Sequence, residues 1–93
     1  MKVLYQHPNG TKEEQEILGV DPMDELFFHH RQITMYVKGQ DIILSIDIGK
    51  RHNHKPVPYE FVVRVGERPK DAIKRLRKEV ENGSKKANIH SAR

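Results

Sequence analysis

The sequence predicts a small α+β domain, with an antiparallel sheet of three to four strands and a C-terminal amphipathic helix packed on one face. Two observations support this class. Apolar residues alternate from Ile33 to Ile48 across a Gly39-Gln40 turn, which is typical of a β-hairpin. Beyond Pro69 the apolar spacing becomes that of a helix. The chain has 93 residues and no cysteine, so we expect one compact domain over residues 1–83.

The N-terminal third carries weaker signals. Residues 2–6 (KVLYQ) predict a short edge strand, and residues 7–10 (HPNG) predict a turn. Residues 11–18 (TKEEQEIL) open with capping-box spacing and predict a short helix. Residues 21–22 (DP) supply an N-cap and a first helical position, so a second helical segment should begin there. Whether residues 26–28 remain helical or enter a strand stays open.

The second half is easier to divide. Residues 49–58 (GKRHNHKPVP) form a polar loop, and residues 59–65 alternate as a third strand should. Residues 69–82 place four apolar side chains on one helical arc: Ala72, Ile73, Leu76 and Val80. The Asn-Gly pair at the end of this stretch predicts that the helix stops. We expect residues 84–93 to be a mobile basic tail.

Charge is divided unevenly along the chain. Residues 1–49 hold four basic and eight acidic residues, whereas residues 50–93 hold thirteen basic and five acidic residues. The net charge is therefore −4 in the first part and +8 in the second, within a total of +4. Such asymmetry points to an anionic partner, because a basic surface attracts polyanions.

The predicted function is that of a small nucleic-acid-binding accessory or regulatory protein that contacts phosphates through loop, helix and tail. Like-charge pairs such as Lys70–Lys74 destabilise a helix by a few tenths of a kcal/mol, and an anion docked there would reverse that cost. The candidate nucleic-acid-binding residues are Lys50, Arg51, His52, His54, Lys55, Lys70, Lys74, Arg77, Lys78, Lys85 and Lys86.

The alternative is a protein–protein interaction module, a small inhibitor or adaptor that docks on an acidic surface of a larger enzyme. On the sheet face away from the C-terminal helix, the pattern places Tyr36, Ile43 and Val62 together within a polar rim. Apolar centres with polar rims are typical of protein-binding patches. We expect the apolar residues of the N-terminal segment to cover this face instead.

Several classes have little support. The three serines Ser45, Ser84 and Ser91 form no recognisable triad, and no Gly-rich phosphate loop occurs, so we expect no enzyme and no cofactor. His52-Asn53-His54 spells the letters of a nuclease family, but that family spreads these residues over a longer unit. Two histidines make no zinc site, so we expect no metal. Neither a signal pattern nor a membrane-spanning run is visible, which predicts a cytoplasmic protein without membrane association.

The order of elements across residues 33–82 resembles the arm-type DNA-binding domains of integrases and, more loosely, double-stranded RNA-binding domains. The integrase likeness implies that the sheet face enters the major groove, but the charge of this sheet is mixed. The second likeness implies a lysine run at the start of the last helix, and Arg68-Pro69-Lys70-Asp71 departs from that run. The likeness rests on element order and on no motif, so we assign no family.

Overall fold

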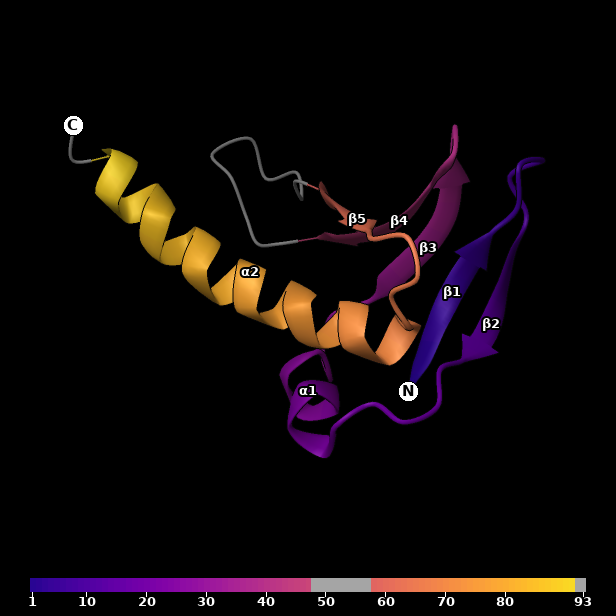
Figure 1. Ribbon diagram of the computed structural model, residues 1–93, viewed down its shortest axis with the longest axis horizontal. Helices are drawn as coiled ribbons and strands as arrows, with labels where there is room; N and C mark the ends of the chain where they lie inside the picture. The colour runs from indigo at the N-terminus through magenta and orange to yellow at the C-terminus, as the bar shows by residue number, and fades with distance from the viewer. Residues whose placement is uncertain (48–57, 92–93) are drawn as a thin grey trace.

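The computed structural model describes the backbone of residues 1–47 and 58–91 and the side chains of residues 1–47 and 58–82. Over these residues the chain is a small α+β domain in which helix α2 crosses one face of a twisted sheet (Figure 1). The elements in order are β1 (Lys2–Gln6), β2 (Lys12–Glu16), α1 (Pro22–Phe27), β3 (Ile33–Lys38), β4 (Asp41–Asp47), β5 (Pro58–Val63) and α2 (Pro69–Ser91).

The sheet is mixed and has five strands in the order β2-β1-β3-β4-β5. The expected hairpin is confirmed, since β3 and β4 pair antiparallel from Ile33↔Ile46 to Lys38↔Asp41. The expectation of a wholly antiparallel sheet of three to four strands was wrong, because β1 pairs parallel to β3. A parallel neighbour needs a crossover connection, and β2 together with α1 supplies it.

The second strand replaces a predicted helix. Residues 12–16 pair with β1 over its whole length, so the helix expected over residues 11–18 was wrong. The strand has no alternation of apolar and polar residues. Its side chains instead form charge pairs with groups at or next to the neighbouring strand. Three glutamates of β2 face polar or positively charged groups at or next to β1: Glu13 with His7, Glu14 with Lys2, and Glu16 with the Met1 amine. Directly after the strand, Ile17 is buried and anchors it to the core.

The helix boundaries differ in part from expectation. Helix α1 begins as predicted, since Asp21 caps it by accepting a hydrogen bond from the Met23 amide at 2.8 Å. It ends at Phe27, which settles the open question about residues 26–28 in favour of helix and cap. Helix α2 continues to Ser91, so its predicted end at the Asn-Gly pair was wrong. A glycine inside a helix lowers the stability of the helix by only about 1 kcal/mol relative to alanine. It ends a helix when its backbone adopts the left-handed conformation.

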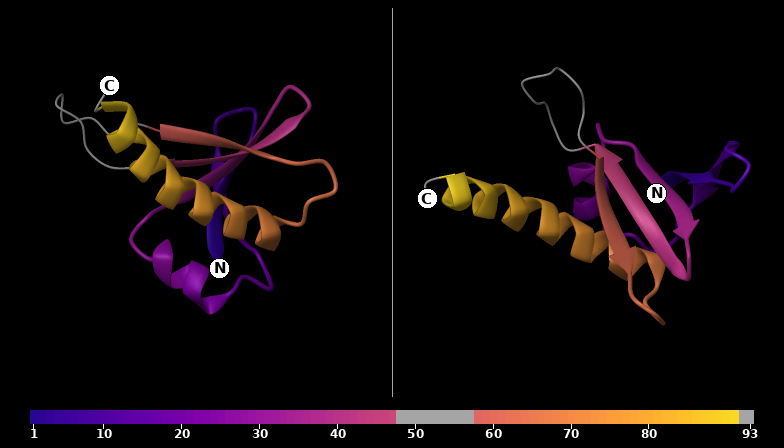
Figure 2. Two further views of the ribbon diagram at one scale, coloured as in Figure 1. Left: turned by 60° about the vertical axis from the view of Figure 1, so that its left-hand side comes forward. Right: turned by 90° about the horizontal axis from the view of Figure 1, so that it is seen from above.

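The core lies between the sheet and α2. Both helices lie on the same side of the sheet (Figure 2, right). The buried apolar residues of this cluster are Val3, Ile17, Phe28, Ile33, Leu44, Ile46, Phe61, Ala72, Ile73, Leu76 and Val80. Since Ile17 and Phe28 belong to this cluster, the N-terminal segment packs beneath α2. The expectation that it covers the opposite sheet face was therefore wrong.

The outer edge of β5 is occupied by side chains of the α2 region. Arg75 donates one hydrogen bond to the Val62 carbonyl at 2.9 Å and two to Glu67 at 2.9 and 2.8 Å. Glu67 in turn accepts a hydrogen bond from the Arg64 amide at 3.0 Å. These contacts satisfy edge groups that would otherwise be free to pair with another strand. Neither helix in the described part of the chain is long and apolar enough to cross a bilayer.

Candidate functional site

Three of the predicted phosphate contacts lie along one face of α2. Its apolar residues pack against the sheet, and Lys70, Lys74 and Arg77 follow the flanking face at helical spacing. The sequence presented this face as an open cationic arc. In the structure this face is covered by residues 19–24, which comprise the end of the loop before α1 and the first residues of α1. We call these residues the acidic cover.

The acidic cover meets these cations in register. Lys74 pairs with Asp21 at 3.9 Å, and Arg77 donates a hydrogen bond to Asp24 at 3.1 Å. The side-chain stem of Lys70 passes so close to Gly19 that a Cβ there would lie 2.8 Å from its Cδ. Asp21 and Asp24 are three residues apart, as are Lys74 and Arg77, but nothing in the sequence pairs one set with the other.

The Asp24–Arg77 pair is the most buried polar contact of the site. Asp24 is 2% exposed, and its Oδ2 atom has no hydrogen-bond partner among the described residues. The guanidinium of Arg77 also lies 5.5 Å from the centre of the Phe27 ring. The hydrogen bond to Asp24 raises the pKa of Arg77. The pair therefore joins the two helices.

The remaining predicted cation of this helix is less constrained. Lys78 is exposed, and no carboxylate of the described residues lies within 4.0 Å of its amine. Arg75, which was not among the predicted contacts, is held by Glu67 and stacks on Phe61 at 4.2 Å. Its hydrogen bonds hold the pKa of the Glu67 carboxyl at about 2. Arg75 thus serves the fold, whereas Lys78 remains available for an anion.

The other predicted contacts lie outside the described residues or side chains. They are Lys50, Arg51, His52, His54 and Lys55 in residues 48–57, and Lys85 and Lys86 in residues 83–93. Together these two ranges, which we call the basic segments, hold six Lys and Arg and no acid. Residues 1–47 and 58–82, which we call the body, hold eleven Lys and Arg and thirteen acids, a net charge of −2.

The basic segments join the body at neighbouring points. One runs between Asp47 and Pro58, which are paired across β4 and β5. Next to Pro58, Tyr59 donates a hydrogen bond to Glu79 at 3.0 Å, one turn of α2 before the second basic segment begins. Burial raises the pKa of Tyr59, and this hydrogen bond adds to the effect. In Figure 1 the end of β4, the start of β5 and the C-terminal half of α2 lie toward the same end of the molecule.

The alternative patch has the predicted arrangement. Tyr36, Ile43 and Val62 are direct neighbours across β3, β4 and β5 on the face away from the helices. Tyr36 donates a hydrogen bond to Glu60 of β5, which raises the pKa of Tyr36, so its ring crosses β4. Ile43 is accordingly 4% exposed, while Val62 is 48% exposed. The patch offers a partner one tyrosine and one valine rather than a broad apolar surface.

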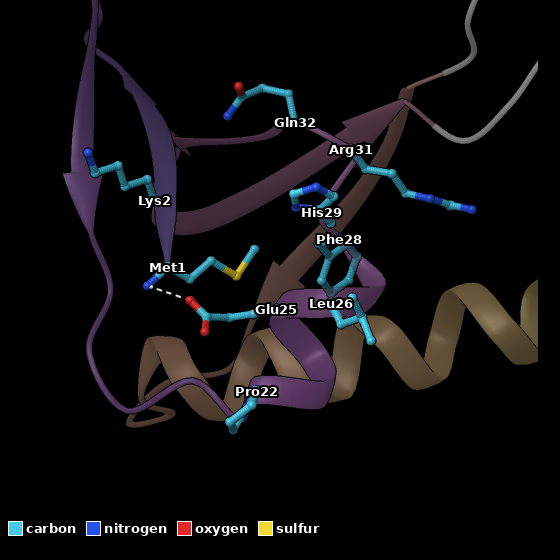
Figure 3. Close-up of a pocket in the computed structure, with 9 residues that line it drawn as sticks. All are labelled: Met1, Lys2, Pro22, Glu25, Leu26, Phe28, His29, Arg31 and Gln32. Atoms are coloured by element: carbon cyan, nitrogen blue, oxygen red, sulfur yellow. Dashed lines mark ion pairs between the residues drawn. The ribbon is translucent and has the colours of Figure 1, made fainter.

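A hollow of about 490 Å³ lies between the start of β1 and α1 (Figure 3). Its floor includes Phe28, and the Met1 amine faces Glu25 there at 3.2 Å. The side chains of Lys2 and Arg31 point away from it. No group of three metal-ligating side chains occurs within the described part of the chain. The polar groups that line the hollow include the Met1 amine, Glu25, His29 and Gln32, and the first two are paired with each other.

Comparison with known proteins gives no relative. No family model, no curated protein and no solved structure matches this chain.

Proposed function

We propose that this chain is a small cytoplasmic nucleic-acid-binding protein of accessory or regulatory type. The observation that supports the proposal is the separation of charge: the body carries −2, and the basic segments carry +6. Both segments join the body beside the Tyr59–Glu79 hydrogen bond. A polyanion is attracted to that end of the molecule and repelled by the acidic β2 strand, so the charge orients the encounter.

The contacts expected at this end are phosphate contacts. Lys50, Arg51, Lys55, Lys85 and Lys86 are the candidate donors in the basic segments, with Lys78 at the nearby surface of α2. Helix α2 extends beyond the strands (Figure 1), and a projecting helix has the diameter that a DNA major groove admits. If five cations engage phosphates, the logarithm of affinity should fall with the logarithm of salt concentration with a slope of about −4 to −5.

The second candidate function is a protein-interaction module. It is favoured by one observation, the uncovered sheet face on which Val62 is exposed beside Tyr36. The two candidates differ in how single substitutions act. A protein interface loses affinity at a few hot spots, whereas phosphate contacts each contribute by a similar small amount.

The test is a titration of the whole chain against random-sequence duplex DNA, single-stranded DNA and RNA at about 50 and about 200 mM salt. One variant replaces Lys50, Arg51 and Lys55 by glutamine, and a second replaces Lys85 and Lys86. The control matched to the second variant replaces Lys12 and Lys38, which lie on the body, by glutamine.

The proposal predicts micromolar or tighter binding at low salt, a steep salt dependence and a loss confined to the first two variants. Equal losses in the control would show that net charge alone determines binding. Absence of binding to all three nucleic acids at about 50 mM salt would refute the proposal.

A further inference from the structure

The acidic cover follows the cations of α2 residue by residue. We call Lys70, Lys74 and Arg77 the cationic row. Three positions of the cover meet it in sequence order: Gly19 at Lys70, Asp21 at Lys74 and Asp24 at Arg77. The cover therefore places carboxylates on α2 where the phosphates of a bound nucleic acid would pair with the same cations.

The contacts of the cover differ in strength. The Asp21–Lys74 pair is long, 3.9 Å, and about half of each side chain is exposed, so solvent screens it. Asp24 is buried, yet one of its oxygens has no hydrogen-bond partner among the described residues, and the Nε atom of Arg77 faces Glu81 only at an ion-pair distance of 3.7 Å. A phosphate offers more acceptor oxygens than a carboxylate and can satisfy such donors.

Release of the cover would leave most of the core in place. The chain is anchored on either side of it by Ile17, 6% exposed, and by Phe28, 3% exposed. Between these anchors, Met23 and Leu26 are 58% and 65% exposed, and Val20 and Phe27 are only partly buried against the core. Helix α1 has six residues, too few to be stable without tertiary contacts. The segment between the anchors can therefore open locally.

We infer that residues 19–24 are an intramolecular competitor, whose Asp21 and Asp24 occupy Lys74 and Arg77 of the cationic row until the phosphate backbone of a nucleic acid replaces them. This inference rests on the proposed function and adds its regulation: the basic segments make the first contact, and the row is added when the cover opens. A bound polyanion then gains the contacts of Lys74 and Arg77 that the closed form withholds.

The test uses Asp21→Asn. Asparagine caps a helix as well as aspartate does, so the capping hydrogen bond to Met23 is kept while the negative charge is removed. Asp21→Ser, which also caps, is a second variant with the same change of charge. The control is Asp41→Asn, an equal charge change at the start of β4, where Asp41 makes no ion pair with other described residues.

Binding is measured by fluorescence anisotropy with a labelled random-sequence single strand of about 20 nucleotides at several salt concentrations. We expect Asp21→Asn to raise affinity about three- to tenfold beyond Asp41→Asn and to steepen the salt slope by about 1. Lys74→Gln should abolish that gain in the Asp21→Asn background and have little effect alone. Equal behaviour of both Asp21 variants and Asp41→Asn would overturn the inference while the proposed function stands. Absence of binding by every variant would remove both.

Discussion

The strongest test of the fold concerns Glu67 and Arg75, which join the start of α2 to the edge of β5. Glu67 accepts two hydrogen bonds from the Arg75 guanidinium and one from the Arg64 amide. Glu67→Gln keeps the size of the side chain and most of its acceptor capacity but removes the negative charge. The variant should therefore lose the charge-assisted part of this contact.

The magnitude follows from the pKa of Glu67, which the Arg75 hydrogen bonds lower from 4.5 to about 2. Taken in full, that difference corresponds to about 3.4 kcal/mol. The Glu67 side chain is 12% exposed and that of Arg75 is 24% exposed, so solvent screening reduces the contribution. We expect Glu67→Gln to lower the free energy of unfolding by about 1–2 kcal/mol at pH 7.

The lowered pKa of Glu67 also determines how the free energy of unfolding changes with pH. Because the folded pKa lies below the unfolded one, the contribution of Glu67 is complete above about pH 4.5 and is lost as the pH falls toward 2. Urea unfolding of the native chain and of Glu67→Gln at a series of pH values measures the difference directly. Glu14→Gln is the control, since its pair with Lys2 is 3.9 Å long and exposed, and it should cost less than about 0.5 kcal/mol. A Glu67→Gln difference that stays constant from pH 7 to about pH 2.5 would refute the reasoning.

Three further substitutions test other parts of the structure. Arg77→Gln leaves the buried Asp24 carboxylate without a cation and should destabilise the fold by about 2–4 kcal/mol in urea unfolding. Leu44→Ala, at a site 1% exposed in the core, should cost about 2–5 kcal/mol by the same assay. Gly19→Ala should lower the melting temperature because Gly19 has a positive φ of 81°, which alanine rarely adopts, although the flexible Lys70 side chain can move away from the new Cβ. A melting temperature of Gly19→Ala equal to that of the native chain would contradict the positive φ at this position.

The elements with apolar periodicity could be predicted from the sequence. The β3–β4 hairpin alternates across its turn, and the buried face of α2 follows the helical spacing of Ala72, Ile73 and Leu76. In both cases burial on one side of the element leaves its period in the sequence. The cap at Asp21 was likewise visible, because it is a local interaction.

Strand β2 could not be predicted from periodicity. Its sequence, KEEQE, favours no buried face, and its glutamates are paired with groups at or next to β1. Such pairs depend on the register between two strands, which tertiary structure decides. The parallel pairing of β1 with β3 is equally non-local.

The candidate site shows the same limit. The sequence shows where the cations lie along the chain, and residues 70–78 are helical as predicted, so these cations have the expected helical spacing. It did not reveal that Asp21 and Asp24 would lie against Lys74 and Arg77, because a polar helix face that packs against other chain carries the same pattern as a solvated one. Ion pairing between elements leaves no period to detect.

The central claim is that a nucleic acid approaches the end of the body where the basic segments begin. The most direct measurement is a two-dimensional amide NMR titration of the isotope-labelled chain with a short single-stranded oligonucleotide. The account predicts that, within the body, shifts are concentrated at Asp47, Tyr59 and Glu79–Asn82 and, as the cover opens, at residues 19–24 and the cationic row, while β1 and β2 are unaffected. Shifts centred on the β1–β2 hairpin or on the Tyr36–Val62 face, or no shifts at all, would contradict it.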